Sequence, residues 1–115
     1  MATRSRIGIV TENKSVISVY VHHDGYPSGV GKELVRDYAT AEAASAVIAK
    51  GDASDLGCNF YSERGETCSP MVSENVEAFL RACKSGEEYA YVFENGAWKC
   101  FDLHGRKPVE VEIPA

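Results

Sequence analysis

Residues 88–102 read EYAYVFENGAWKCFD, and this stretch decides the fold. Two runs rich in aromatic and other strand-forming residues flank the dipeptide Asn95-Gly96. Asn-Gly between two such runs is the strongest short-range signal of a β-hairpin, because both residues accept the positive φ angles of a tight turn. A two-residue turn sets Phe93 opposite Trp98. We therefore expect a C-terminal antiparallel pair of strands in which Trp98 is largely buried.

Further strand patterns lie toward both ends of the chain. An apolar run at 7–10 and a run rich in β-branched residues at 16–21 are separated by a polar turn, which predicts a second hairpin. In residues 109–113, valine and isoleucine alternate with glutamate, which predicts a half-buried strand with its acids toward water. Residues 51–57 are expected to form a loop, and residues 59–62 a short strand.

Three helices are expected between these strands. The first begins near Val30, where apolar residues recur at helical spacing. The second follows Thr40, which is expected to be its N-cap, and ends at Gly51. The third is expected to be capped by Ser73 and to end before Gly86.

The order of these elements predicts the architecture. Strands cluster at both ends of the chain and the helices lie between them, which does not fit a doubly wound parallel sheet. We expect a single α+β domain over residues 1–115, with an antiparallel or mixed sheet of about four to six strands and about three helices packed on one face.

The composition is that of an ordinary globular protein with an acidic balance. Hydrophobic residues make up 44% and charged residues 25% of the chain, and the formal net charge is -5 with a pI of about 5.1. This balance argues against a broad basic face for nucleic acid and against docking on an anionic membrane. No stretch approaches the roughly 20 apolar residues of a membrane span, and no long apolar run follows the basic N-terminus. We therefore expect a cytoplasmic protein, and the sequence leaves its oligomeric state open.

The four cysteines are spaced widely and irregularly, at Cys58, Cys68, Cys83 and Cys100. None of them belongs to a Cys-x-x-Cys pair of the kind that holds structural zinc. In a cytoplasmic protein we expect reduced thiols, and we expect neither a metal nor another cofactor.

Polar and ionisable side chains are concentrated between the 16–21 strand and the first helix. Residues 20–32 read YVHHDGYPSGVGK, which includes two histidines, an aspartate, two tyrosines and a lysine. A connector needs glycine or proline at a position or two, but it does not need this concentration of side chains. Lys32 would lie against the helix dipole, which is more favourable if an anionic group meets it. The candidate binding residues are His22, His23, Asp24, Tyr26, Lys32 and, beside two acids later in the chain, Arg64.

Two nucleotide-binding motifs are incomplete in this loop. Between Gly25 and Gly31 there are five residues where the phosphate-binding P-loop has four, and Glu33 stands where its magnesium-binding hydroxyl should be. The dinucleotide fingerprint lacks its third glycine, because Leu34 occupies that position. A Gly-rich turn that enters a helix can still offer backbone N–H groups to an anion, so a small anionic ligand stays an alternative.

The histidines give two further alternatives. His22, His23 and Asp24 resemble part of a metal site, but neighbouring residues of a strand point to opposite faces, so the two rings diverge unless the strand has ended. Either histidine can act as a base toward Cys58, Cys68 or Ser28, and nothing in the spacing selects one of these nucleophiles. The sequence therefore favours a non-catalytic protein over a small enzyme.

Several short motifs spread over almost the whole chain occur together. They are Met1-Ala-Thr-Arg-Ser5 with Ile7, Tyr20-x-His22-x-Asp24-Gly-Tyr-Pro-x-Gly-Val-Gly31-x-x-Leu34, Gly51-Asp-x-Ser54-x-Leu-Gly57, Arg64-Gly-Glu66, and Glu88-Tyr-x-Tyr-x-Phe93 with Gly96 and Trp98. On these motifs the chain resembles a family of small proteins of tailed phages and bacterial genomes that are generally described as hypothetical. Two features depart from the family. His23 stands where a tryptophan is expected, and the loop at Gly57 and Cys58 is shorter than is usual in the family.

The resemblance implies a phage or prophage accessory protein that acts in the bacterial cytoplasm, and it implies no particular activity. Small phage proteins of this kind often bind and redirect a host protein or counter a host defence. We therefore expect a non-catalytic interaction protein that binds a host factor through residues 22–32 with Arg64 nearby. The alternative is a small-ligand or nucleotide binder, or a small enzyme, that uses the same loop. A flat loop favours a protein partner, whereas a pocket with several convergent N–H groups favours a ligand.

Overall fold

The chain folds around one mixed β-sheet in a computed structural model that describes residues 2–65, 70–84 and 86–114. The strands in these ranges are β1 (Ser5–Val10), β2 (Val16–Val21), β3 (Ala53–Asp55), β4 (Cys58–Phe60), β5 (Met71–Ser73), β6 (Tyr89–Glu94), β7 (Ala97–Asp102) and β8 (Val109–Val111). The helices are α1 (Lys32–Asp37), α2 (Ala41–Ala49) and α3 (Val76–Cys83), with a π-helical turn at Pro27–Gly31 and a 3-10 turn at Tyr61–Arg64. No helix in the described ranges is both long enough and apolar enough to cross a membrane.

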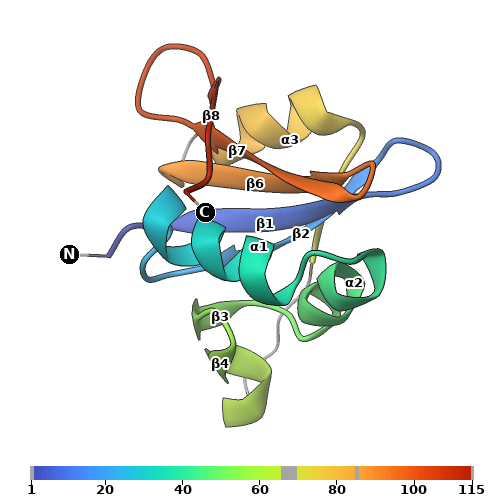
Figure 1. Cartoon of the computed structure of the whole chain (residues 1–115), viewed down its shortest axis with the longest axis vertical. Helices are drawn as coiled ribbons and strands as arrows, with labels where there is room; N and C mark the ends of the chain where they lie inside the picture. The colour runs from blue at the N-terminus through green and yellow to red at the C-terminus, as the bar shows by residue number, and fades with distance from the viewer. Residues whose placement is uncertain (1, 66–69, 85, 115) are drawn as a thin grey trace.

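Figure 1 shows β1 in the middle of the sheet. The strand order is β4-β3-β2-β1-β6-β7-β8, and β5 pairs with the first half of β2. β1 runs antiparallel to β2 and parallel to β6, so the sheet is mixed. The α+β class is therefore confirmed. The sheet is larger than expected because two further strands of three residues each, β3 and β5, join it.

The C-terminal hairpin forms as the sequence predicts. β6 and β7 pair around a turn at Asn95 and Gly96, whose φ angles are 54° and 78°. Positive φ at both positions is what this tight turn requires. Phe93 lies opposite Trp98, their ring centroids are 5.2 Å apart, and Trp98 is only 8% exposed. Trp98 Nε1–H donates to the backbone oxygen of Tyr38 at 2.8 Å, so the indole nitrogen has a partner inside the fold.

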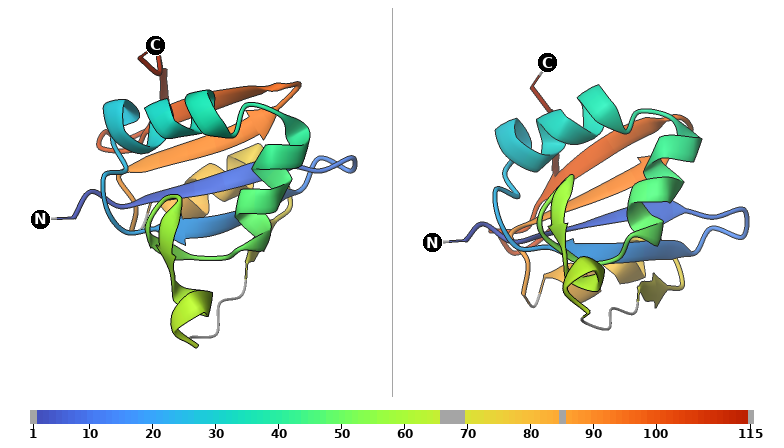
Figure 2. Two further views of the ribbon diagram at one scale, coloured as in Figure 1. Left: turned by 60° about the horizontal axis from the view of Figure 1, so that its bottom comes forward. Right: turned by 90° about the horizontal axis from the view of Figure 1, so that it is seen from below.

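The helices cover both faces of the sheet, which corrects the expectation that all of them pack on one face (Figure 2). α1 and α2 pack on one face, over a core that includes Tyr91 and Phe93 of β6. α3 packs on the other face, over Ala90 and Val92 of the same strand. Because successive residues of a strand point to opposite faces, the unbroken apolar run of β6 makes both faces apolar. Each face therefore needs a helix to exclude water.

The start of one helix is confirmed and that of another is corrected. Thr40 caps α2, because its hydroxyl accepts the N–H of Ala43 at 3.1 Å. Ser73 does not cap α3 but lies in β5, and Asn75 is the N-cap, whose side chain accepts the N–H of Ala78 at 2.8 Å. Serine and asparagine are equally good N-caps, so propensity alone does not choose between them.

Residues 51–57, which were expected to form a loop, contain β3. β3 and β4 form a short hairpin whose turn holds Gly57 at a φ of 85°, a conformation that glycine adopts without strain. β3 joins the sheet through a single residue pair, Val21 with Ala53. The strand expected at 59–62 corresponds to β4, which ends at Phe60 before the 3-10 turn.

Candidate functional site

Most of the candidate binding residues lie on one connection, residues 22–32, which we call the 22–32 loop (Figure 1). It leaves the end of β2 and leads into α1. This is the end of the sheet at which β1 and β6 begin, because Ser5 pairs with both Val21 and Tyr89. Arg64 comes from another element, the 3-10 turn after β4, and its side chain lies outside the described residues.

The first part of the loop continues beside β3. β2 ends at Val21, and the N–H groups of His22 and His23 then donate to backbone oxygens of β3 at 3.0 and 2.8 Å. The two imidazole rings do not diverge as they would on a strand but meet edge to face, with 4.6 Å between their centroids. They meet because the strand has ended before the pair. The Tyr20 hydroxyl, 2.6 Å from His22 Nδ1, holds the first ring in place.

Gly25 anchors the middle of the loop to the sheet. Its N–H donates to the Thr3 oxygen at 2.8 Å, and its own oxygen accepts the hydroxyl proton of Tyr91 at 2.7 Å. Tyr91 is fully buried in β6, and this burial raises the pKa of its phenol, so the hydroxyl stays a donor. A Cβ at position 25 would lie 2.7 Å from the Thr3 oxygen and 2.8 Å from the Ser5 Cβ. Only glycine fits this close approach of loop and strand.

The second half of the loop folds back on the first. Val30 N–H donates to the Asp24 oxygen at 2.8 Å, and Gly29 N–H donates to the Tyr26 oxygen at 2.9 Å. The N–H of Lys32 likewise bonds back into the π-helical turn. A Cβ at Gly29 would overlap the backbone oxygen of Asp24, so this position also requires glycine. These N–H groups are bonded within the chain, so the Gly-rich turn does not offer them to an anion.

The anchored backbone presents polar and aromatic side chains to solvent. Those of His23, Asp24 and Lys32 are exposed, His22 is half-buried, and Tyr26 is 40% exposed. The Tyr26 hydroxyl donates to Asp24 Oδ1 at 3.2 Å. The Asp24 carboxylate raises the pKa of Tyr26, first through this hydrogen bond and then through its charge. The loop therefore offers aromatic faces and charges of both signs.

The described residues bring no cluster of metal-ligating side chains together at the loop. No group of three or more His, Cys, Asp or Glu side chains among them could hold a metal ion. Of the cysteines, Cys83 and Cys100 are buried in the two cores. Cys68 and the side chain of Cys58, the two cysteines that the sequence offers as nucleophiles, lie outside the described residues.

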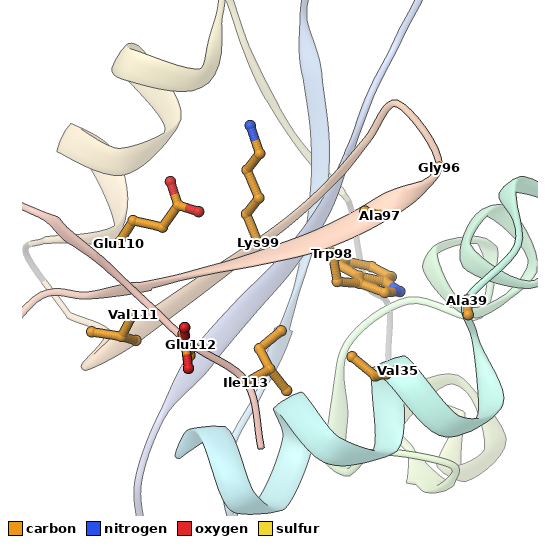
Figure 3. A pocket seen from close by; sticks show the side chains of 10 residues that line it. All are labelled: Val35, Ala39, Gly96, Ala97, Trp98, Lys99, Glu110, Val111, Glu112 and Ile113. Atoms are coloured by element: carbon orange, nitrogen blue, oxygen red, sulfur yellow. The ribbon is translucent and has the colours of Figure 1, made fainter. Parts of the chain in front are cut away.

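Four hollows of the described surface lie away from the loop. None of these four is lined by a residue of the 22–32 loop. The largest of the four, about 600 Å³, lies between α1 and the β7 and β8 strands (Figure 3). Val35, Trp98 and Ile113 bring apolar side chains to it, and Val35 is 43% exposed.

A second polar cluster, which sequence reasoning missed, lies at the end of β7. Asp102 Oδ1 accepts the His104 N–H at 2.9 Å and lies 2.7 Å from Nδ1 of the same residue. The backbone N–H, more than the ring, lowers the pKa of Asp102. The His104 ring also meets Tyr89 edge to face at 5.3 Å. The sequence pattern Asp-x-His directly after a strand could have predicted this cluster, because an aspartate side chain often accepts the backbone N–H two residues later.

Comparison of the chain with protein-family models, with curated proteins and with solved structures gave no match.

Cys83 and Cys100 are expected to resist alkylation in the folded protein. Burial raises the pKa of the Cys83 thiol to about 12 and that of Cys100 to about 11. Because the thiolate is the reactive form, both residues should be labelled at mildly alkaline pH only as the protein unfolds. Peptide mass spectrometry after a pulse of iodoacetamide, with and without denaturant, measures this. Rapid labelling of either residue without denaturant would contradict the burial of that thiol.

Proposed function

We propose that this protein is a phage-type accessory protein that acts without catalysis, by binding a bacterial host protein through the 22–32 loop. One observation carries the proposal: an anchored backbone holds exposed His, Asp, Tyr and Lys side chains in a fixed arrangement. The bonds of Gly25 to Thr3 and Tyr91 tie this loop to the sheet. The phage context is supported by the resemblance of the sequence motifs alone.

A loop that is already ordered suits protein recognition. Ordering a mobile loop on binding costs free energy, and an anchored loop avoids most of that cost. Tyrosine offers a large amphipathic contact surface with few rotatable bonds, which is why it is enriched at interfaces. Asp24 and Lys32 add charges, which select among partners through complementarity.

A small anionic ligand or a nucleotide is the alternative occupant of the same loop, and the geometry gives it less support. Such a ligand needs convergent N–H donors in a hollow. The N–H groups of Gly25, Gly29 and Val30 instead donate to carbonyl oxygens of the chain. Lys32 is exposed and favours an anionic group, but a carboxylate of a partner protein satisfies it as a phosphate would.

Joint replacement of His23, Tyr26 and Lys32 by alanine is expected to weaken partner binding at least about tenfold, because exposed interface residues act mainly on affinity. The free energy of unfolding should change by only about 0.5 kcal/mol or less, as is usual for surface substitutions. Proteins from a bacterial lysate are captured on the immobilised chain and identified by mass spectrometry. The affinity of the purified partner is then measured for the wild type and the variant, together with thermal melting.

Glu12, Glu74 and Lys99 provide a triple-alanine control, because they are exposed on other parts of the surface. This control should bind the partner as the wild type does. The proposal is wrong if the loop variant melts much earlier while its folded fraction still binds normally, because the loop is then scaffold. If the control variant loses partner binding to the same extent, the binding cannot be assigned to the 22–32 loop.

A further inference from the structure

Figure 1 shows α3 and the segment that joins β7 to β8. Residues of both elements line a second hollow of the described surface. This hollow, which we call the α3 groove, has a volume of about 540 Å³. Val76 and Leu80 of α3 and Phe101 of β7 contribute apolar side chains to its lining. All three are only partly buried against the core beneath α3, so apolar surface stays in contact with water.

The rim of the α3 groove is basic although the protein as a whole is acidic. Arg81, Lys84, Arg106 and Lys107 line it, which is four of the twelve Lys and Arg residues in a chain with a net charge of -5. Among the described residues that line the groove, Glu77 is the only acid, and it is paired with Arg81 at 3.1 Å. Four cations against one carboxylate leave a formal excess of three positive charges at this surface.

The helix dipole explains only part of this arrangement. Arg81 and Lys84 lie at the C-terminal end of α3, where cations are favoured. Arg106 and Lys107 come from the β7–β8 connection, to which that explanation does not apply. Like charges gathered on both sides of an apolar groove repel one another. The arrangement becomes more favourable when carboxylates of a partner lie between them.

We propose that the α3 groove binds an acidic amphipathic helix of a partner protein. The apolar side chains of that helix lie on Leu80 and Phe101, and its Asp and Glu side chains meet the basic rim, as in other helix-in-groove interfaces. Nucleic acid fits less well, because its bases need several aromatic faces and Phe101 is the only aromatic residue among the described lining residues. The site is independent of the 22–32 loop, which contributes no residue to this groove.

The test uses three short fluorescent helical peptides and the full chain. The parent peptide carries Leu at every third or fourth position and Glu elsewhere, the second has Gln in place of Glu, and the third has Ser in place of Leu. Fluorescence anisotropy is expected to show at least about tenfold tighter binding of the parent than of the other two, because both the apolar and the acidic groups contribute. Lys84→Glu combined with Lys107→Glu should weaken binding of the parent at least about tenfold.

Lys14→Glu combined with Lys50→Glu is the matched control, because it makes the same change in net charge at exposed positions outside both the groove and the 22–32 loop. It should change binding less than about twofold at physiological salt, where distant charges are screened. If the charge-reversal variant at Lys84 and Lys107 does not fold, Lys84→Gln combined with Lys107→Gln removes the same two positive charges and should also weaken binding of the parent peptide. The proposal is overturned if the parent peptide does not bind, if the Gln peptide binds equally well, or if the control weakens binding as much as the groove variants. Tighter binding of a single-stranded oligonucleotide than of the parent peptide overturns it as well.

Discussion

Replacing Phe79 by alanine is expected to lower the free energy of unfolding by about 3–5 kcal/mol. Phe79 is fully buried on α3 and packs in one core cluster with Val16 and Val92 of the sheet. Its truncation leaves a cavity that the strands beneath cannot fill. Because a domain is stable by only about 5–15 kcal/mol, the variant should lose a large part of its margin. Urea denaturation followed by circular dichroism measures the change.

Val72 provides the matched control, because it is an apolar residue of β5 that is 68% exposed. Val72→Ala should change the free energy of unfolding by about 0.5 kcal/mol or less. If Phe79→Ala costs no more than this control, α3 does not pack on the sheet as described. The α3 groove would then lose one of its walls.

Replacing Gly25 by alanine is expected to lower the free energy of unfolding by about 1–3 kcal/mol, the usual cost of forcing a methyl group into a filled space. The new methyl group would lie 2.7 Å from the Thr3 oxygen and 2.8 Å from the Ser5 Cβ. Either the 22–32 loop or the start of β1 must therefore move, and the hydrogen bond from Tyr91 lengthens. We expect a lower melting temperature and, because the loop is no longer anchored, weaker partner binding.

Gly86 provides the control for this substitution. A Cβ built there meets no heavy atom within 4 Å, so alanine fits without displacement. Gly86→Ala should leave stability unchanged or raise it by about 0.4–1 kcal/mol, since alanine reduces the freedom of the unfolded chain. Equal melting temperatures for the two alanine variants would contradict the close approach at Gly25.

Local signals in the sequence predicted the elements that depend on neighbouring residues. Asn95-Gly96 specified the C-terminal hairpin, and Thr40 caps α2 as expected. Pairings between distant segments leave no such signal, which is why the short strand β3 was expected to be a loop. The sequence did contain a signal that helices cover both faces of the sheet. Residues 89–93 include no charged side chain, so neither face of this strand is suited to contact with water.

For the candidate site, the sequence predicted the position of the loop but not its geometry. The concentration of polar side chains marked residues 22–32. The role of Gly25 depends on Thr3 and on Tyr91, which is far away in the sequence, so spacing alone does not reveal it. Lys84 and Arg106 likewise line one groove only because the chain folds α3 and the segment after β7 into the same region.

The central strand β1 has two neighbours that become available at very different times during synthesis. β2 follows it after a short turn, whereas β6 is translated only near the other end of the chain. Until β6 has left the ribosome, one side of β1 carries unpaired N–H and C=O groups, which can recruit strands of other nascent chains. Pairing β1 with β6 also brings together segments that are far apart in the sequence. Because this costs chain entropy before any contact forms, the parallel pairing is expected to be slow. The growing chain is therefore most exposed to misassembly just before β6 emerges.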